Sequence, residues 1–384
     1  MPPPIPQFSL ERQHRGLEAE LGAAWARVAA SGRYAQGPEC AALETEIAAW
    51  MGAAGAPTQG EARLRAVVCS SGTDALHLAL RAAGVAAGDV VLTTPFTFFA
   101  TAGAILLAGA RPESVDISPS SFNLDPAALE AALARHRSAP GPAARLGAIL
   151  PVHLYGRLAG MEAIGALAAA AGVPVIEDAA QALGAHRGGR PAGAWGAAAA
   201  FSFYPTKNLG ALGEGGMVTT TDAGIEERLR LLRVHGSRRR YEHELAGWNG
   251  RMHELQAAAL RAKLPHLDAW NRRRREIALL YRHHLNGVVE QLPEIEPGHV
   301  FHQYVIRVPN RDAVRQKLLQ RGIGAEVYYP IPLHRQPALR DFAPAAPLPE
   351  AERAAAEVLA LPMFPELTDA EAARVAGALR ECLA

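Results

Sequence analysis

One lysine, Lys207, lies in the segment FSFYPTKNLGALGEGG (residues 201–216), between an apolar stretch with hydroxyl groups and a glycine-rich loop. The chain has 39 basic residues, and all are arginine except three lysines: Lys207, Lys263 and Lys317. A primary amine forms an imine with an aldehyde, which a guanidinium cannot do, and such an imine anchors pyridoxal phosphate on enzymes. A coding bias toward arginine explains the same composition, so this lysine alone leaves both an anchor and a solvated turn open.

Other groups in the sequence suit the remaining parts of that cofactor. The run Ser71-Gly72-Thr73-Asp74 follows an apolar segment and opens a helical pattern. A glycine turn at a helix start exposes backbone N–H groups to a phosphate. A simple helix cap explains this run equally well. Ser202 lies five residues before Lys207, a spacing that lets its hydroxyl reach the phosphate while the amine reaches the aldehyde.

A pair of carboxylates, Glu177-Asp178, ends the apolar run VPVI. A carboxylate there would pair with the pyridine nitrogen and keep it protonated, which makes the ring an electron sink. The alternative is a cap for a following helix. Gln181, three residues later, is placed to bond the ring oxygen. Phe98, in PFTFF, is placed to stack on the ring or else to pack in the core.

The elements that must position these groups follow an α/β pattern. Short apolar runs (RAVVCSS, DVVLTT, ESVDI, GAILPVH, VPVIEDA, AAAAFSFYPT and GGMVTTT) alternate largely with helical segments. This predicts a mostly parallel sheet covered on both faces, with ligands beyond the carboxyl ends of its strands. The pattern changes near Trp248, where we expect a long helix to Leu264 and beyond. A further helix to His284, a strand HQYVIRV, a helix, a strand-like AEVYYP and a final helix follow. We therefore predict a large domain over residues 1–250 and a smaller α+β domain over residues 251–384.

Composition narrows the function classes. The 384 residues carry a net charge of +1, which argues against a nucleic-acid binder. Three widely spaced cysteines give neither a disulfide framework nor a zinc pattern, so we expect no metal and a cytoplasmic location. The uncharged run from Val90 to Ala110 is long enough to cross a membrane. It contains Pro95, and we expect a strand, a loop and a helix there instead.

Taken together, the motifs resemble the DegT/DnrJ/EryC1/StrS family of sugar aminotransferases, which have the fold type I (aspartate aminotransferase-like) architecture of pyridoxal phosphate enzymes. The resemblance rests on SGRYAQGPE, SSGTDALHLAL, PFTFFAT, PVHLYG, VIEDAAQALGA, FSFYPTKNLGALGEGGMV, WNGRMHELQAA and YYPIPLH. These stretches span most of the chain. An excursion at residues 52–60 and a proline-rich N-terminus depart from the family pattern without touching the cofactor motifs.

The resemblance implies a role for each matching residue. Lys207 corresponds to the lysine that holds the cofactor, Asp178 to the aspartate on the pyridine nitrogen, and Gln181 to the glutamine on the ring oxygen. Phe98 corresponds to the stacking aromatic. The implied phosphate ligands are Gly72, Thr73, Ser202 and, from a neighbouring subunit, Asn249. The implied contacts to a nucleotide sugar are Tyr34, Arg238, Arg239, Arg240 and His334.

The family also implies an activity. We expect a homodimeric aminotransferase whose cofactor alternates between pyridoxal and pyridoxamine phosphate. It would move an amino group from L-glutamate to C3 of a keto sugar linked to a nucleotide. The alternatives are a C4-specific sugar aminotransferase, a fold type I enzyme acting on amino acids, and a non-enzymatic regulatory protein. The last predicts loss of the lysine or the aspartate, and both are present.

Overall fold

The computed structural model describes residues 3–57, 63–138 and 144–383, so residues 58–60 of the expected excursion lie outside the described part. Its centre is a sheet in two hydrogen-bonded parts, joined by a parallel bridge between Ile149 and Val175. The strands in spatial order are β1 (Arg65–Cys69), β9 (Gly216–Thr220), β8 (Ala198–Ser202), β5 (Ile176–Asp178), β4 (Leu146–Leu150), β2 (Val90–Thr93) and β3 (Arg111–Ser114). Strand β9 runs antiparallel to both neighbours and the other pairs are parallel. The predicted mostly parallel sheet is confirmed.

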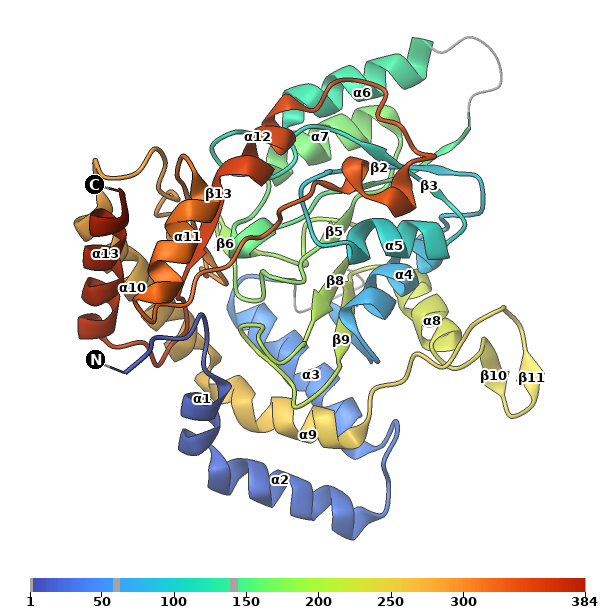
Figure 1. Cartoon of the computed structure of the whole chain (residues 1–384). Helices are drawn as coiled ribbons and strands as arrows, with labels where there is room; N and C mark the ends of the chain where they lie inside the picture. Colours follow the sequence, from blue (N-terminus) through green and yellow to red (C-terminus); the bar gives the residue numbers. More distant parts are fainter. Residues whose placement is uncertain (1–2, 58–62, 139–143, 384) are drawn as a thin grey trace.

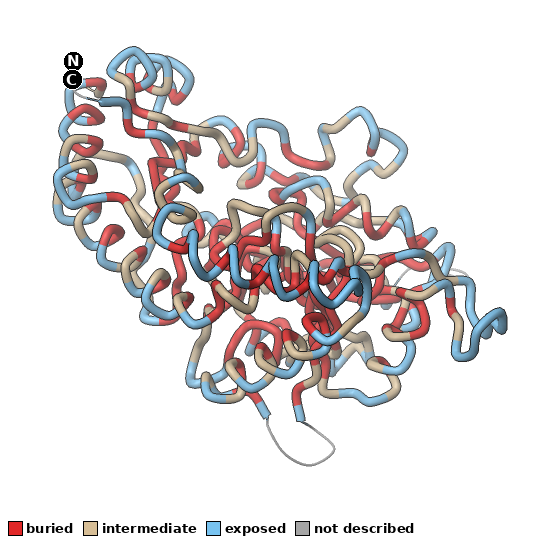
Figure 2. Tube along the Cα trace, turned by 90° about the horizontal axis from the view of Figure 1, so that it is seen from below, coloured by how far each residue is buried: buried red, intermediate tan, exposed pale blue. Residues whose placement is uncertain are grey.

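Helices cover both faces of this sheet (Figure 1). Successive strand residues point to opposite faces, so that Ala66 and Val68 of β1 join one hydrophobic cluster while Val67 and Cys69 join another. The first cluster contains residues of α3 (Pro38–Ala53), α6 (Pro126–Ser138), α7 (Met161–Ala171) and α9 (Glu254–Lys263). The second contains residues of α4 (Gly72–Ala82), α5 (Ala100–Leu107) and α8 (Ala223–Leu232). Figure 2 shows the resulting buried centre within an exposed outer layer.

A smaller unit packs around a separate core. Its elements are α10 (Leu267–Leu285), β12 (Tyr304–Arg307), α11 (Arg311–Gln320), β13 (Val358–Leu361) and α13 (Asp369–Leu383). Strands β12 and β13 pair antiparallel. Ile5, near the other end of the chain, belongs to this core and bridges Ile323. The two ends of the chain accordingly lie on the same side of the molecule, near opposite ends of α13 (Figure 1). The predicted division at residue 250 stays a prediction, and α9 beyond it packs on α3 of the large unit.

The remaining elements are short or peripheral. They are α1 (Leu10–Gly16), α2 (Glu18–Ser31), α12 (Pro349–Glu357), β6 (His186–Arg187), β7 (Arg190–Pro191), β10 (Ser237–Arg239), β11 (Glu242–His243) and the 3₁₀ turns Leu154–Gly156, Leu264–His266, Leu333–Arg335 and Pro337–Leu339. The β10–β11 hairpin projects from the body of the molecule (Figure 1). No helix in the described ranges is long and apolar enough to span a bilayer. The run from Val90 to Ala110 forms strand β2, a loop and helix α5, as predicted.

Two expected elements differ from the structure. The helix predicted from Trp248 begins only at Glu254, because residues 248–253 are held extended by bridges from Asn249 to Val234 and from His253 to Ala35. The strand-like AEVYYP contributes a single bridge, between Glu326 and Ala360, rather than a strand. Two prolines at positions 330 and 332 follow this bridge and have no N–H to extend the pairing.

Candidate active site

A cavity of about 530 Å³ opens at the carboxyl end of β5, beside the start of α4. Seven of the residues predicted from the sequence line it together: Gly72, Thr73, Phe98, Asp178, Gln181, Ser202 and Lys207. Four widely separated motifs therefore meet at one place, as expected for side chains that follow the strands of an open parallel sheet.

One end of the cavity suits an anion. Helix α4 begins at Gly72, and the N–H groups of Gly72 and Thr73 belong to its first turn, where no carbonyl within the helix accepts from them. A side chain at Gly72 would place its Cβ only 2.6 Å from the Cβ of Ser202, so that glycine is required for this close approach. The Ser202 hydroxyl accepts from the Tyr204 N–H at 3.2 Å and can still donate its own proton. These groups form a cradle that fits a phosphate.

Asp178 ends strand β5 and is buried, with 4% of its surface exposed. Its carboxylate accepts from the Thr101 hydroxyl at 2.7 Å and from the Ala180 N–H at 3.2 Å. Burial raises the pKa of Asp178, while these bonds and the charge of Lys207 oppose the shift. The helix-cap alternative does not hold, because residues 179–185 form turns rather than a helix. A buried carboxylate of this kind favours a cationic partner in the cavity.

Glu177 lies on the other side of the same strand and has a structural role. Its carboxylate is fully buried and contacts the His153 ring at 2.9 Å. It also accepts from the backbone N–H groups of Gly193, Trp195 and Gly196. The alternation of strand side chains thus separates two neighbouring carboxylates into one that fixes a loop and one that faces the cavity.

Lys207 lies in a tight loop between β8 and β9. Its N–H donates to the Tyr204 carbonyl at 2.8 Å, and a side chain at Gly210 would lie 2.1 Å from the Pro205 carbonyl oxygen. The buried Nζ of Lys263 holds the Gly210 carbonyl at 2.9 Å. Burial lowers the pKa of Lys207 to about 8, against the opposing charge of Asp178. A lysine with this pKa is a free base far more often near neutral pH than an ordinary lysine.

Gln181 and the aromatic residues connect the cavity to the smaller unit. The Gln181 Oε1 accepts from the Tyr155 N–H at 2.6 Å, and its Nε2 donates to the Tyr329 hydroxyl at 3.2 Å. The Tyr155 hydroxyl in turn donates to the Tyr328 carbonyl. Phe98 is 59% exposed, and its ring centre lies 6.1 Å from that of Tyr329. The amide of Gln181 is therefore oriented by the protein on both sides.

The other predicted residues lie outside this cavity. Tyr34 and Asn249 are exposed, and the Asn249 Oδ1 accepts from Arg251 at 2.8 Å. On the projecting hairpin, Arg238 pairs with Glu227 and Glu244, and Arg239 and Arg240 are exposed. The His334 side chain is 4% exposed and pairs with Glu352 at 3.1 Å, beside a separate small cavity. Within one chain, the structure does not bring these residues to Lys207.

Glu254 anchors the segment that carries Asn249. Its carboxylate accepts from the N–H groups of Gly37, Glu39 and Cys40 at the start of α3, and its own N–H donates to the Tyr34 carbonyl. The exposed segments that carry Tyr34, expected to contact the sugar, and Asn249, expected to contact the cofactor phosphate, are thereby fixed to each other. The motif WNGRMHE alone does not predict this contact, because the helix that Glu254 caps lies more than 200 residues earlier in the chain.

The sequence did not indicate several residues that line the cavity, among them Thr101, Glu214, His302, Gln303 and Tyr329. Thr101 falls within the quoted PFTFFAT motif, and its spacing from Phe98 by one helical turn was an available signal. The side chain of His302 comes from the chain just before β12, and no local pattern marks it.

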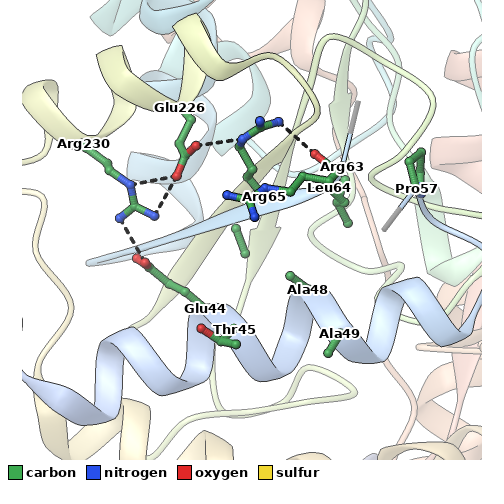
Figure 3. Close-up of a pocket in the computed structure, with 11 residues that line it drawn as sticks. Glu44, Thr45, Ala48, Ala49, Pro57, Arg63, Leu64, Arg65, Glu226 and Arg230 are labelled. Atoms are coloured by element: carbon green, nitrogen blue, oxygen red, sulfur yellow. Dashed lines mark hydrogen bonds and ion pairs between the residues drawn. The ribbon is translucent and has the colours of Figure 1, made fainter. Parts of the chain in front are cut away.

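A second cavity of about 470 Å³ lies beside the edge strand β1, between α3 and α8 (Figure 3). Its charged groups form ion pairs, with Arg230 contacting Glu44 at 3.0 Å and Arg65 contacting Glu226 at 2.9 Å. These pairs join α8 to α3 and to the edge strand β1. No cluster of histidine, cysteine or carboxylate residues in the described part of the chain has the arrangement of a metal site.

Comparison with known proteins agrees with this geometry. The model of the DegT/DnrJ/EryC1/StrS aminotransferase family matches residues 16–380. The chain belongs to this family. It is 47% identical to the "pleiotropic regulatory protein" of Geobacillus stearothermophilus, with 95% of each chain covered. It is 44% identical to the UDP-N-acetyl-3-dehydro-alpha-D-glucosamine 3-aminotransferase of Acidithiobacillus ferrooxidans, with 99% of this chain and 98% of the other covered.

Among solved structures, the chain is similar to DesV of S. venezuelae in complex with a ketimine intermediate. The TM-score is 0.90 at 43% identity, with 99% of each chain covered. The expected family and its fold type I architecture are confirmed, and the chain is an aminotransferase. This family depends on pyridoxal phosphate.

Proposed function

We propose that the chain uses pyridoxal phosphate to transfer an amino group from L-glutamate to C3 of a nucleotide-linked keto sugar. One observation carries the proposal: a half-buried lysine, a buried carboxylate and the start of a helix at a glycine line the same cavity. These three groups match an aldehyde, a pyridine nitrogen and a phosphate, which are three of the polar groups of the cofactor. The free, buried cysteines fit the expected cytoplasmic location.

Gly72, Thr73 and Ser202 would hold the phosphate, Asp178 the ring nitrogen and Lys207 the aldehyde. When bound, the cofactor supplies an electron sink for the carbanion formed at the donor carbon. Lys207 removes the proton from the Cα atom of the donor and carries it within the cavity, since its lowered pKa leaves part of the amine unprotonated at neutral pH. Phe98 and Tyr329 would form the aromatic side of the cofactor site, since both line this cavity with ring centres 6.1 Å apart.

The nature of the acceptor is supported by the relatives and by the cavity. The Acidithiobacillus relative is named for 3-amination of a 3-dehydro sugar, and this favours C3 over C4. Among the described residues that line the cavity, Lys207 is the only lysine or arginine. An amino-acid aminotransferase would bind a substrate carboxylate in both half-reactions and would favour an arginine there, whereas a sugar aminotransferase binds one only with its donor. The cations for a diphosphate must come from elsewhere, and the projecting hairpin offers Arg238, Arg239 and Arg240.

We further propose a homodimer in which this hairpin and Asn249 reach the partner's cavity. The hairpin extends into solvent (Figure 1), and its Tyr241 is 81% exposed. Asn249 lies outside the cavity of its own chain, although the family supplies this residue to a phosphate. A two-fold interface would complete both sites equivalently.

The decisive experiment uses the purified holoenzyme with ¹⁵N-glutamate and a panel of 3-keto and 4-keto sugars linked to UDP or dTDP. We expect a ¹⁵N-labelled amino sugar, detected by mass spectrometry, from a 3-keto substrate. Lys207→Ala is the matched inactive control, and borohydride reduction should attach the cofactor to Lys207. A purely regulatory role predicts no labelled sugar from any substrate, and attachment at Lys263 or Lys317 would contradict the assigned site.

A further inference from the structure

His302 lines the cavity and has no role in the proposed function, although its neighbours fix its protonation. It precedes strand β12, is 7% exposed and lines the same cavity as Lys207. Its Nδ1 lies 3.1 Å from the Oδ1 of Asn208, the residue that directly follows Lys207. The ring therefore contacts the lysine loop on one side and the cavity on the other.

A chain of buried amides determines which nitrogen of His302 carries the proton. The Asn271 Nδ2 donates to the Leu183 carbonyl at 3.2 Å, so its Oδ1 is left to accept from Asn208 at 2.7 Å. The Asn208 Nδ2 also donates to the Val300 carbonyl at 3.1 Å. Both backbone carbonyls can only accept, so neither amide can be reversed without placing two acceptors together. The Asn208 Oδ1 thus faces His302 and requires a proton on Nδ1.

Burial also keeps this ring neutral. Desolvation lowers the pKa of His302, and the positive charges of Lys207 and of Arg274, from α10, lower it further. Arg274 lies close because its Nη1 donates to the carbonyls of Phe301 and His302. A neutral ring with its proton on Nδ1 has an unprotonated Nε2, which can accept a hydrogen bond but cannot donate one.

We propose that His302 is a positioning residue for Lys207: its Nε2 accepts an N–H of the free amine and so directs the amine lone pair toward the donor carbon. This inference rests on the proposed function, in which Lys207 removes the Cα proton. An amine bears two N–H groups and one lone pair, and a fixed acceptor at one N–H restricts rotation about the Cε–Nζ bond. Small errors of geometry at such a step cost up to about 100-fold in rate.

Two substitutions separate this role from a structural one. His302→Gln places an amide group near the position of Nε2 and loses the bond to Asn208, whereas His302→Asn keeps a donor for Asn208 and loses the group at Nε2. We expect the rate of amino transfer from glutamate in a single turnover to fall by roughly 10- to 100-fold in the Asn variant and far less in the Gln variant. The deuterium isotope effect with α-deuterated glutamate should rise in the Asn variant, because proton transfer becomes slower.

A measurement on the cofactor-free wild type tests the tautomer directly. With ¹⁵N-labelled histidine, the His302 ring, assigned by its loss in His302→Gln, should show a protonated Nδ1 and an unprotonated Nε2 with no titration between pH 6 and 9. A proton on Nε2, or an Asn variant as fast as the Gln variant, would overturn the inference while leaving transamination intact. A wild type that takes no amino group from glutamate would instead overturn the proposed function, and this inference with it.

Discussion

The bond between Thr101 and Asp178 offers a quantitative test of how the protein prepares the ring-nitrogen site. The hydroxyl and the carboxylate are 2.7 Å apart, and both residues are buried. A hydrogen bond to a charged group contributes about 1.5–3 kcal/mol. Thr101→Val removes it with little change in shape and should raise the pKa of Asp178 further, because this bond opposes the effect of burial. The ionised carboxylate that pairs with a protonated ring nitrogen then becomes less available.

Loss of the hydrogen bond between Thr101 and Asp178 should lower the affinity for the cofactor. The bond is present with and without cofactor, so the loss appears only where Asp178 must give up a proton to pair with the ring. At about 1.4 kcal/mol per tenfold change, Thr101→Val should therefore weaken binding by at most roughly 10- to 150-fold, and most strongly at low pH. Pyridoxamine phosphate is the suitable probe, since it forms no covalent bond with Lys207, and its fluorescence reports binding to the cofactor-free protein. Thr101→Ser retains the hydroxyl and should bind like the wild type.

A second threonine, Thr97, should have a smaller effect on cofactor affinity. The hydroxyls of Thr97 and Thr101 lie 3.1 Å apart, and because Thr101 donates its proton to Asp178, Thr97 must be the donor between them. This bond joins two neutral groups and is worth about 0.5–1.5 kcal/mol, so Thr97→Val should weaken binding by about tenfold at most. Unchanged affinity in Thr101→Val, or a larger loss in Thr97→Val, would refute this reasoning.

Three further predictions follow from the same site. Asp178→Asn should slow the half-reaction with glutamate in stopped-flow measurements. It should also raise the free energy of unfolding of the cofactor-free protein more at pH 7 than at pH 4. Burial raises the pKa of Asp178 in the folded protein, so the wild type loses stability as the pH rises from the unfolded-state pKa through the folded-state pKa. The uncharged amide has no such loss. An unchanged stability difference would contradict the buried charge. The rate at which cofactor-free protein captures pyridoxal phosphate should rise with pH and reach half its maximum near the Lys207 pKa of about 8, and a midpoint above 10 would mean an ordinary lysine. Mixing inactive Lys207→Ala and Asn249→Ala chains should restore one site per hybrid dimer, whereas no recovery despite proven chain exchange would place both residues in one chain's site.

The sequence predicted the central sheet and the cofactor motifs because both depend on local patterns. Apolar runs of strand length and the glycine-rich turns fix where side chains leave the sheet, so Asp178 and Ser202 could be placed at strand ends without coordinates. The start of α9 was missed, since the extended stretch before it is held by bridges to Val234 and Ala35, which lie elsewhere in the chain. The local sequence pattern predicts a helix but carries no information about distant segments that pair with the same residues.

The residues that support the site could not be predicted from the sequence for the same reason. Thr101 acts on a carboxylate 77 positions away, and His302 on an amide 94 positions away. Their types are common in cores, and only the fold shows which buried donor meets which acceptor. The roles of Tyr34 and His334 stay predictions, because one chain places neither of them at the cavity.

The two central charges are arranged for a ligand rather than for the stability of the empty protein. Asp178 is buried and Lys207 is half-buried along one cavity, yet the two side chains form no direct ion pair among the described residues. A direct pair would offset part of the cost of burying each charge. Keeping the carboxylate and the amine apart leaves that cost in place, and burial shifts the pKa of each toward its neutral form. A molecule that brings a cationic nitrogen to one and an aldehyde to the other relieves both, and its binding then stabilises the fold. The same separation that destabilises the cofactor-free protein is thus what gives the cavity its affinity for a molecule with these two ends.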